Sequence, residues 1–163
     1  MTNQATTNQR LSEYAPILLI ISLLAFIISW LAPTYSDAKG YQAYQETYDF
    51  LFKIGDKWSS QDTTIDKIML ILMGISPHTN YIFVIATLIL LFNREGINPT
   101  LQSFLCNTLI ICFLINLCWL YIVKDSFGML HIGYYLWAAS FFISAFVGYN
   151  FVPKKEKPPA QAS

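Results

Sequence analysis

The chain of 163 residues is 55% hydrophobic and only 12% charged, whereas a typical soluble domain has about 25% charged residues. Its apolar residues form long blocks and do not recur with the period of a half-buried helix or strand, which excludes an ordinary soluble domain and predicts an all-α, polytopic membrane protein. The formal net charge of zero provides no field that attracts nucleic acid, so we expect the lipid bilayer, and no nucleic acid, as a partner.

The first apolar block is interpreted as a retained transmembrane helix over about residues 15–32. Residues 1–13 are polar and of low complexity, so we expect a disordered tail ahead of a membrane domain that covers residues 14–152. A cleaved signal peptide is the alternative. The apolar run, however, exceeds the usual hydrophobic region of about 7–15 residues, and Trp30 would occupy a position before the cut that needs a small residue.

A polar connection of residues 34–67 follows, and it is predicted to form an extramembrane helical loop. Tyr41, Tyr44 and Tyr48 fall at helical spacing on one face, which predicts an amphipathic, interfacial helix between the first and second spans. Such a helix either covers the end of the bundle or presents a surface for a partner protein.

The second span is predicted over about residues 76–92. Ser76 is a favourable N-cap, and Pro77 suits the first turn of a helix. The preceding apolar stretch from Ile65 to Ile75 is too short to cross a bilayer core, which needs about 20 residues. We expect this stretch to be interfacial or re-entrant, or to be continuous with the second span.

The third and fourth spans are predicted over about residues 101–123 and 130–151. The basic and Pro-rich tail of residues 153–163 is expected to be disordered. The whole pattern predicts a four-transmembrane-helix bundle with both termini on one side of the membrane. If that side is the cytoplasm, five Lys and Arg residues lie inside and five outside, so the positive-inside count is a tie. The Lys-rich cluster after the fourth span favours cytoplasmic termini.

Aromatic side chains gather near the predicted span ends on one side of the membrane, where indole and phenol groups prefer the headgroup region. The predicted interfacial residues are Trp30, Tyr41, Tyr44, Tyr48, Tyr81, Trp119, Tyr134, Tyr135 and Trp137. This belt supports the span ends and leaves the compartment open.

The four predicted spans contain no Asp, Glu, Lys or Arg. Pumps and proton-coupled transporters usually carry ionisable groups there, so that class is disfavoured. His78 and His131 are interpreted as interfacial hydrogen-bonding residues, with a metal site or an acid–base pair as the alternative. Cys106, Cys112 and Cys118 share one apolar segment and are interpreted as small buried residues. We therefore expect neither catalytic activity nor a metal or cofactor.

Two asparagines, Asn107 and Asn116, are predicted inside the third span. They are nine positions apart, which is about 180° on an α-helix, so they face opposite ways. An asparagine in lipid seeks an interhelical hydrogen bond. Either both join the third helix to neighbours within the chain, or one faces a partner protein.

Small residues recur along the first and fourth spans, and such residues let helix backbones approach each other in lipid. The predicted packing residues are Ser22, Ala25 and Ser29 in the first span and Ser140, Ser144 and Gly148 in the fourth. We expect the two helices to pack on these faces, with docking of a partner on one face as the alternative.

A resemblance to an uncharacterised group of small bacterial four-span inner-membrane proteins rests on the stretch Gly133-Tyr134-Tyr135-Leu136-Trp137-Ala138-Ala139-Ser140. In that group an interfacial segment with a glycine and an asparagine also precede the second span, and Gly74 and Asn80 are similar to these. The resemblance implies a bacterial inner membrane and carries no known activity.

The layout is also similar to that of immunity proteins of the colicin A type, which have four spans, cytoplasmic ends and a long first periplasmic loop. The segment from Ile65 to Phe92 carries this resemblance. It implies a protein that recognises the hydrophobic hairpin of a pore-forming toxin within the bilayer and prevents opening of the pore.

The sequence is therefore interpreted as a non-catalytic integral membrane protein that acts through intramembrane helix–helix contacts, as a small subunit, accessory factor or scaffold. Its partner would be another membrane protein or a second copy of the chain. Immunity against a pore-forming bacteriocin is the first alternative. A small transporter or channel lined by Asn and Ser side chains is the second.

Overall fold

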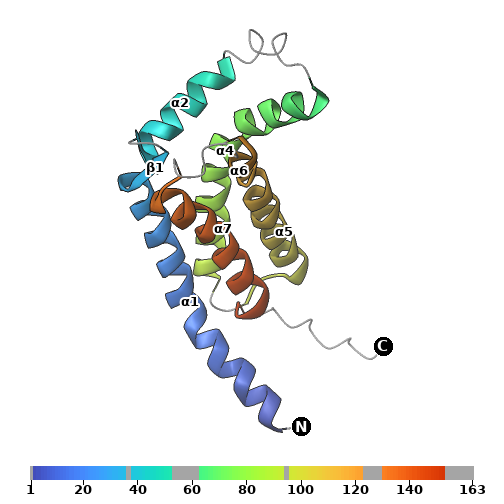
Figure 1. The fold of residues 1–163 in the computed structure, drawn as a ribbon. Coiled ribbons are helices and arrows are strands. Elements are labelled where there is room, and N and C mark those ends of the chain that lie inside the picture. Colours follow the sequence, from blue (N-terminus) through green and yellow to red (C-terminus); the bar gives the residue numbers. More distant parts are fainter. Residues whose placement is uncertain (1, 36–37, 53–62, 94–95, 123–129, 153–163) are drawn as a thin grey trace.

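The computed structural model describes residues 2–35, 38–52, 63–93, 96–122 and 130–152 (Figure 1). The elements in chain order are α1 (Thr2–Leu31), β1 (Pro33–Tyr35), β2 (Ala38–Lys39), α2 (Gly40–Phe52), α4 (Thr64–Phe92), α5 (Pro99–Asn116), α6 (Cys118–Ile122) and α7 (Ile132–Asn150). Within these residues, α1, α4, α5 with α6, and α7 are long and apolar enough to cross a membrane. The prediction of an all-α, multi-pass membrane fold is confirmed, while the predicted C-terminal tail lies outside the described residues.

The four long helices form one bundle, and α4 and α7 also contact each other across its centre. α7 contacts α1 and α5, and α4 contacts α5 and, less extensively, α1. The start of α1 and the end of α7 lie at the same end of the bundle, while α2 lies at the opposite end (Figure 1). Phe83 and Phe141 are fully buried at the centre, with ring centroids 4.7 Å apart.

The first helix begins at Thr2, so the prediction of a disordered tail over residues 1–13 is wrong for the backbone from Thr2 onward. This segment contains neither Gly nor Pro. A helix that already exists extends without a new nucleation cost, and nothing in the tail stops it. Glu13–Leu31 is the part of α1 that is apolar enough to span a membrane.

The second span is not a separate helix that starts at Ser76, because α4 is continuous from Thr64 to Phe92. Its N-cap is Thr63, whose side chain accepts a hydrogen bond from the backbone N–H of Asp66. Continuity with the preceding stretch is therefore the one of the three expectations that holds.

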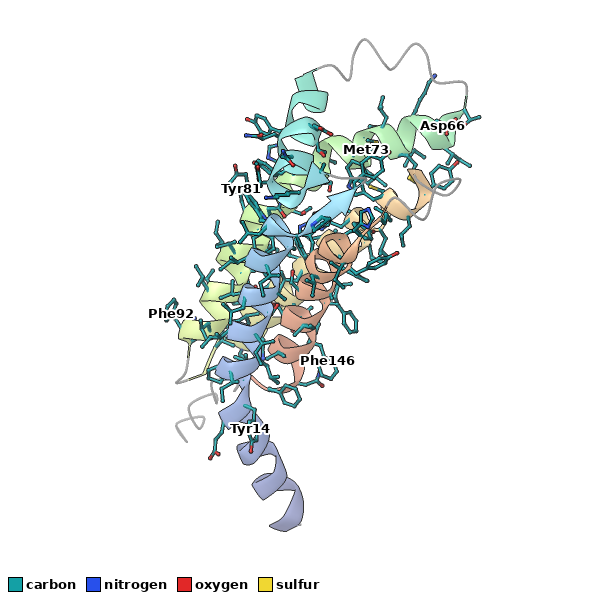
Figure 2. All side chains as sticks on the ribbon, turned by 60° about the vertical axis from the view of Figure 1, so that its left-hand side comes forward. Tyr14, Asp66, Met73, Tyr81, Phe92 and Phe146 are labelled. Atoms are coloured by element: carbon teal, nitrogen blue, oxygen red, sulfur yellow. The ribbon has the colours of Figure 1, made fainter. Side chains whose placement is uncertain are left out.

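The continuous α4 bends where Pro77 lies inside it. Figure 2 shows Asp66 and Met73 on a limb that crosses the end of the bundle, and Tyr81 at the start of the limb that runs down the bundle. Proline has no N–H to donate to the carbonyl of Met73 and its ring clashes with that carbonyl, so the helix kinks there. Its first limb thus lies across the bundle, as an interfacial segment would, although the helix does not break.

The connection between α1 and α4 contains a short antiparallel hairpin, β1–β2, that the sequence did not predict. The hairpin touches the start of α7, because the backbone N–H of His131 donates to the carbonyl of Thr34 at 3.1 Å. A Cβ on Gly133 would lie 2.5 Å from the carbonyl oxygen of Pro33, so only glycine allows this approach. The predicted interfacial helix is present as α2.

The third span runs from Pro99 through α5 and continues in α6 after an interruption at Leu117. Asn98 caps α5 by accepting a hydrogen bond from the backbone N–H of Thr100 at 2.9 Å. The fourth span, α7, begins two positions later than predicted and ends one position earlier. Both spans therefore lie close to their predicted ranges.

Candidate functional site

Four hydroxyl and carbonyl groups join α1, α4 and α7 in the buried middle of the bundle. Ser22 Oγ donates to the carbonyl of Ser140 at 2.7 Å and lies 2.8 Å from Ser144 Oγ. Thr87 Oγ1 donates to Ser144 Oγ at 3.1 Å. Because the proton of Ser22 is directed at Ser140, Ser144 donates to Ser22, and the bonds run in one direction from α4 through α7 to α1. The structure thus has the contact expected between the first and fourth spans.

The remaining small residues do not all face this contact. Ala25 is half-buried, and Ser29 is buried with its hydroxyl donating to its own helix at Phe26 O, 2.6 Å away. Gly148 faces α5, because a Cβ there would lie 2.6 Å from Cys106 Sγ. Positions four apart rotate by about 40° around a helix, so a stripe that begins against α1 at Ser140 has turned by about 80° at Gly148. The expected packing of Gly148 on the first span is therefore wrong.

Asn116 is the centre of a second polar cluster, between α5 and the bend of α4. Its side chain is fully buried, and Oδ1 accepts from Ser76 Oγ at 3.0 Å and from Thr79 Oγ1 at 3.2 Å. Trp119 Nε1 donates to Ser76 Oγ at 3.2 Å, and the Tyr134 hydroxyl donates to the backbone carbonyl of Asn116 at 3.1 Å. Asn116 Nδ2 has no hydrogen-bond partner among the described residues. The cluster fixes the bent part of α4 against α5 and α7.

Asn107 faces away from this cluster, as the nine-residue spacing predicts. Its side chain is exposed on the outer face of α5, where Oδ1 accepts a hydrogen bond from the Tyr149 hydroxyl at 2.5 Å. The two asparagines therefore both bind neighbours within the chain, Asn116 on α4 and Asn107 on α7. Of the two alternatives, the structure therefore has the one in which both asparagines join the third span to neighbours within the chain.

Aromatic residues from five helices, α1, α2, α4, α6 and α7, meet where α2 covers the bundle. Trp30 stacks on Tyr44 with ring centroids 5.3 Å apart, and the hydroxyls of Tyr44 and Tyr81 lie 2.7 Å apart. Burial and the hydrogen bond with Tyr81 raise the pKa of Tyr44 to about 12. Trp137 Nε1 donates to Asn80 Oδ1 at 2.7 Å. Five predicted interfacial residues, Trp30, Tyr44, Trp119, Tyr134 and Trp137, line one cavity here.

The other predicted interfacial residues lie around this cavity without lining it. Tyr48 stacks on Tyr44 at a centroid distance of 6.1 Å, and Tyr135 packs edge-on against Tyr134 at 5.4 Å. Tyr41 points outward and is 39% exposed. The aromatic belt is thus an inner group that packs and an outer group that faces the surroundings.

The cavity beneath α2 has a volume of about 60 Å³. A single water needs about 10–15 Å³ of such volume, so the space admits a few waters or one small polar group. Hydroxyls of Thr34, Thr47 and Ser76 and the amide of Asn80 line it beside the aromatic rings. This arrangement can hydrogen-bond a small ligand. It offers no nucleophile paired with a base among the described residues.

Metal-ligating groups do not converge in the part of the chain that the structure describes, where no three His, Cys, Asp or Glu residues lie together. Cys106, Cys112 and Cys118 are buried, and none of them forms a disulfide bond within the described residues. The ring of His78 lies among tyrosines, 6.1 Å from that of Tyr48 and 6.5 Å from that of Tyr81.

Polar residues of α4 were missed by the sequence analysis. Ser76, Thr79 and Thr87 supply bonds to both clusters, and their spacing of three and eight places them on one face of the helix. Their position on one helix face is the sequence signal that could have identified them as packing residues. Gln102 was also missed. It is fully buried and donates from Nε2 to the carbonyls of Gly148 at 2.6 Å and Val152 at 3.0 Å, so it joins the start of α5 to the end of α7.

No family model, curated protein or solved structure matches this chain. The two resemblances drawn from the sequence stay predictions.

Proposed function

We propose that this chain is a non-catalytic integral membrane protein that acts through helix–helix contacts within the bilayer, as a small subunit, accessory factor or scaffold. The observation that carries the proposal is the division of the spans into a polar inside and an apolar outside. The hydroxyls of Ser22, Ser144 and Thr87 and the amide oxygen of Asn116 bond inside the bundle. The contacts left for another helix along the outer face of α1 are therefore apolar.

The outer face of α1 is an extended apolar surface available for such a contact. Its exposed residues are Ile17, Ile20, Ile21, Leu24, Ile27, Ile28 and Leu31. α1 packs extensively against α7 alone of the long helices, and only part of its circumference is covered. A transmembrane helix of another membrane protein, or of a second copy, would fit along this face.

We place the protein in the bacterial inner membrane with both termini in the cytoplasm. The common end of the bundle shared by the start of α1 and the end of α7 supports termini on one side (Figure 1). The Lys-rich sequence after α7 supports the cytoplasm as that side.

Immunity against a pore-forming bacteriocin is the second candidate. It is favoured by the position of the hairpin and α2, which cover the bundle end opposite the termini, as a long first periplasmic loop would. Survival of cells that express the chain, when they are exposed to such a toxin, would support it. The close packing of Phe83 on Phe141 at the centre of the bundle counts against the transporter alternative.

Site-specific photo-crosslinking in native membranes tests the proposal. A photoreactive amino acid at Leu24, which is 51% exposed on the outer face of α1, is expected to give one discrete crosslinked species. The same amino acid at Phe104, which is 65% exposed on the outer face of α5, serves as the control. A chain that stays uncrosslinked at Leu24 and purifies as a monomer from mild detergent would overturn the proposal.

A further inference from the structure

The cavity beneath α2 lies apart from the outer face of α1 that carries the proposed function. Its lining comes from α1, β1, α2, α4, α6 and α7. Its volume of about 60 Å³ corresponds to about four to six water molecules, so a ligand of about four non-hydrogen atoms fits it. None of the described residues that line it is Asp, Glu, Lys or Arg, so an ionised ligand would find no counter-ion among them. The cavity therefore suits a small uncharged molecule.

Three hydroxyl groups of the lining present their oxygens as hydrogen-bond acceptors. Ser29 Oγ and Thr47 Oγ1 each donate their proton to a backbone carbonyl of their own helix, at 2.6 Å. Thr34 Oγ1 donates to the carbonyl of Ala32 at 3.2 Å. A hydroxyl group has one proton and two lone pairs, and none of the described residues donates to these three oxygens. A ligand that uses them has to bring hydrogen-bond donors of its own.

Two indole rings of the lining are held by hydrogen bonds within the protein. Trp119 Nε1 donates to Ser76 Oγ at 3.2 Å, and Trp137 Nε1 donates to Asn80 Oδ1 at 2.7 Å. These bonds fix the aromatic walls of the cavity before a ligand binds. Because the amide oxygen of Asn80 is bound to Trp137, its nitrogen, which carries two N–H donors, is the group that can meet a ligand carbonyl.

We propose that this cavity binds a small uncharged primary amide, of the size of acetamide or urea. The NH₂ group of the ligand donates to two of the three hydroxyl oxygens of Ser29, Thr34 and Thr47, and its carbonyl accepts from the amide of Asn80. An amide of this size is planar and partly apolar. It therefore packs against the aromatic side chains that complete the lining, which are Trp30, Tyr35, Tyr44, Trp119, Tyr134 and Trp137. Such residues lie at the headgroup level, where a water-soluble ligand arrives.

Saturation-transfer NMR of the full chain in detergent micelles tests the proposal with three probes of one shape. Acetamide, acetone and acetate each carry a methyl group next to a carbonyl carbon, so the methyl signal reports binding of all three. Acetone lacks the N–H donors, and acetate lacks them and is charged. Acetamide is expected to bind, while acetone and acetate are expected to bind about fivefold more weakly or less, as the loss of one or two hydrogen bonds implies.

Two variants locate the binding site. Thr47→Val keeps the shape of the side chain, removes one acceptor, and is expected to weaken acetamide binding about fivefold. Thr108→Val is the matched control, because the Thr108 hydroxyl also donates to the carbonyl four positions earlier but lies on α5, outside the cavity. Ala43→Leu fills the cavity from α2 and is expected to abolish the acetamide signal.

The outcomes separate an amide site from a cavity that holds water alone. The proposal is overturned if the wild type gives no more acetamide signal than Ala43→Leu, if acetone or acetate binds as well as acetamide, or if Thr47→Val binds acetamide like Thr108→Val. None of these results depends on crosslinking at Leu24, so the amide site and the proposed function can each fail alone.

Discussion

The hydroxyl oxygens of Ser22 and Ser144 lie 2.8 Å apart, and neither side chain has any exposed surface. This contact joins the first and last spans of the chain at the middle of the bundle. Thr87 extends it to α4, so three helices depend on one set of hydrogen bonds. Bonds of this kind between transmembrane helices contribute about 0.6–2 kcal/mol each, and the absence of bulk at these positions allows the close approach.

Ser144→Leu is expected to lower the thermal midpoint of the protein in detergent strongly. The larger side chain has no space between α1 and α7, and it removes the partner of both Ser22 and Thr87. Ser144→Ala removes only the hydroxyl and is expected to cost about 0.6–2 kcal/mol. Thr108→Leu is the control, because the hydroxyl of half-buried Thr108 donates only to its own helix, at Phe104 O. Equal midpoints for Ser144→Leu and Thr108→Leu would contradict the packing described.

The two asparagines of α5 give a matched pair of variants. Asn116→Ala is expected to destabilise the protein by about 1–3 kcal/mol, because Ser76 and Thr79 lose their shared acceptor in a buried place. Asn107→Ala is expected to change the thermal midpoint little, because Asn107 is exposed. Chemical denaturation in mixed micelles measures both. If Asn107→Ala lowered the stability more than Asn116→Ala, the stabilising polar contact would lie on the face of α5 opposite to the one described, and the description would be contradicted.

Much of the bundle follows from the sequence, because apolar blocks of spanning length have few structures available in a membrane. The spans at 101–123 and 130–151 were placed within a few residues for this reason. The error at Ser76 and Pro77 has a different origin. A cap residue followed by proline is also compatible with the interior of a bent helix, and only the tertiary contact of Ser76 with Asn116 and Trp119 decides between the two.

The bend of α4 is measurable as a distance between spin labels at Ile68 and Ile85, both of which are exposed. A straight helix would hold these positions about 25 Å apart. The bent helix is expected to give a clearly shorter distance, and Pro77→Ala is expected to lengthen it because the backbone N–H is restored. The labels are introduced after the three cysteines are replaced by alanine.

A second label pair calibrates that measurement. Thr100 and Leu114 lie at the exposed surface of the straight α5 and should be separated by about 21 Å. If the calibration holds and the pair at Ile68 and Ile85 already shows about 25 Å in the wild type, the bend does not exist in solution.

The hydrogen bond of Tyr44 with Tyr81 is expected to make stability depend on alkaline pH. Burial and this bond raise the pKa of Tyr44 from 10.0 to about 12. The stabilisation is complete below the unfolded value and is lost as pH rises from 10 to 12, because the unfolded chain releases its proton first. The difference in thermal midpoint between the wild type and Tyr44→Phe should therefore shrink over this range. A constant difference up to pH 12 would contradict the raised pKa of Tyr44.

The candidate site was less predictable than the bundle. The sequence placed Trp30, Tyr44, Tyr81 and Trp137 at one interface, since indole and phenol groups prefer that layer. It could not show that Asn80 is held by Trp137, because these residues lie 57 positions apart and meet only when α4 and α7 pack. The sequence also could not show that Gly148 faces α5 and not α1, because this depends on where α5 packs in the bundle.

The central claim is that the chain crosses the membrane four times and returns both ends to the cytoplasm. Single cysteines at Thr6, Glu46, Thr100 and Ser163, in a chain whose own cysteines are replaced by alanine, test it by labelling of intact spheroplasts with a membrane-impermeant maleimide. The account predicts labelling at Glu46 alone, with the other three reacting only after the membrane is opened. Labelling at Ser163 together with protection at Thr6 would give an odd number of spans and contradict the account.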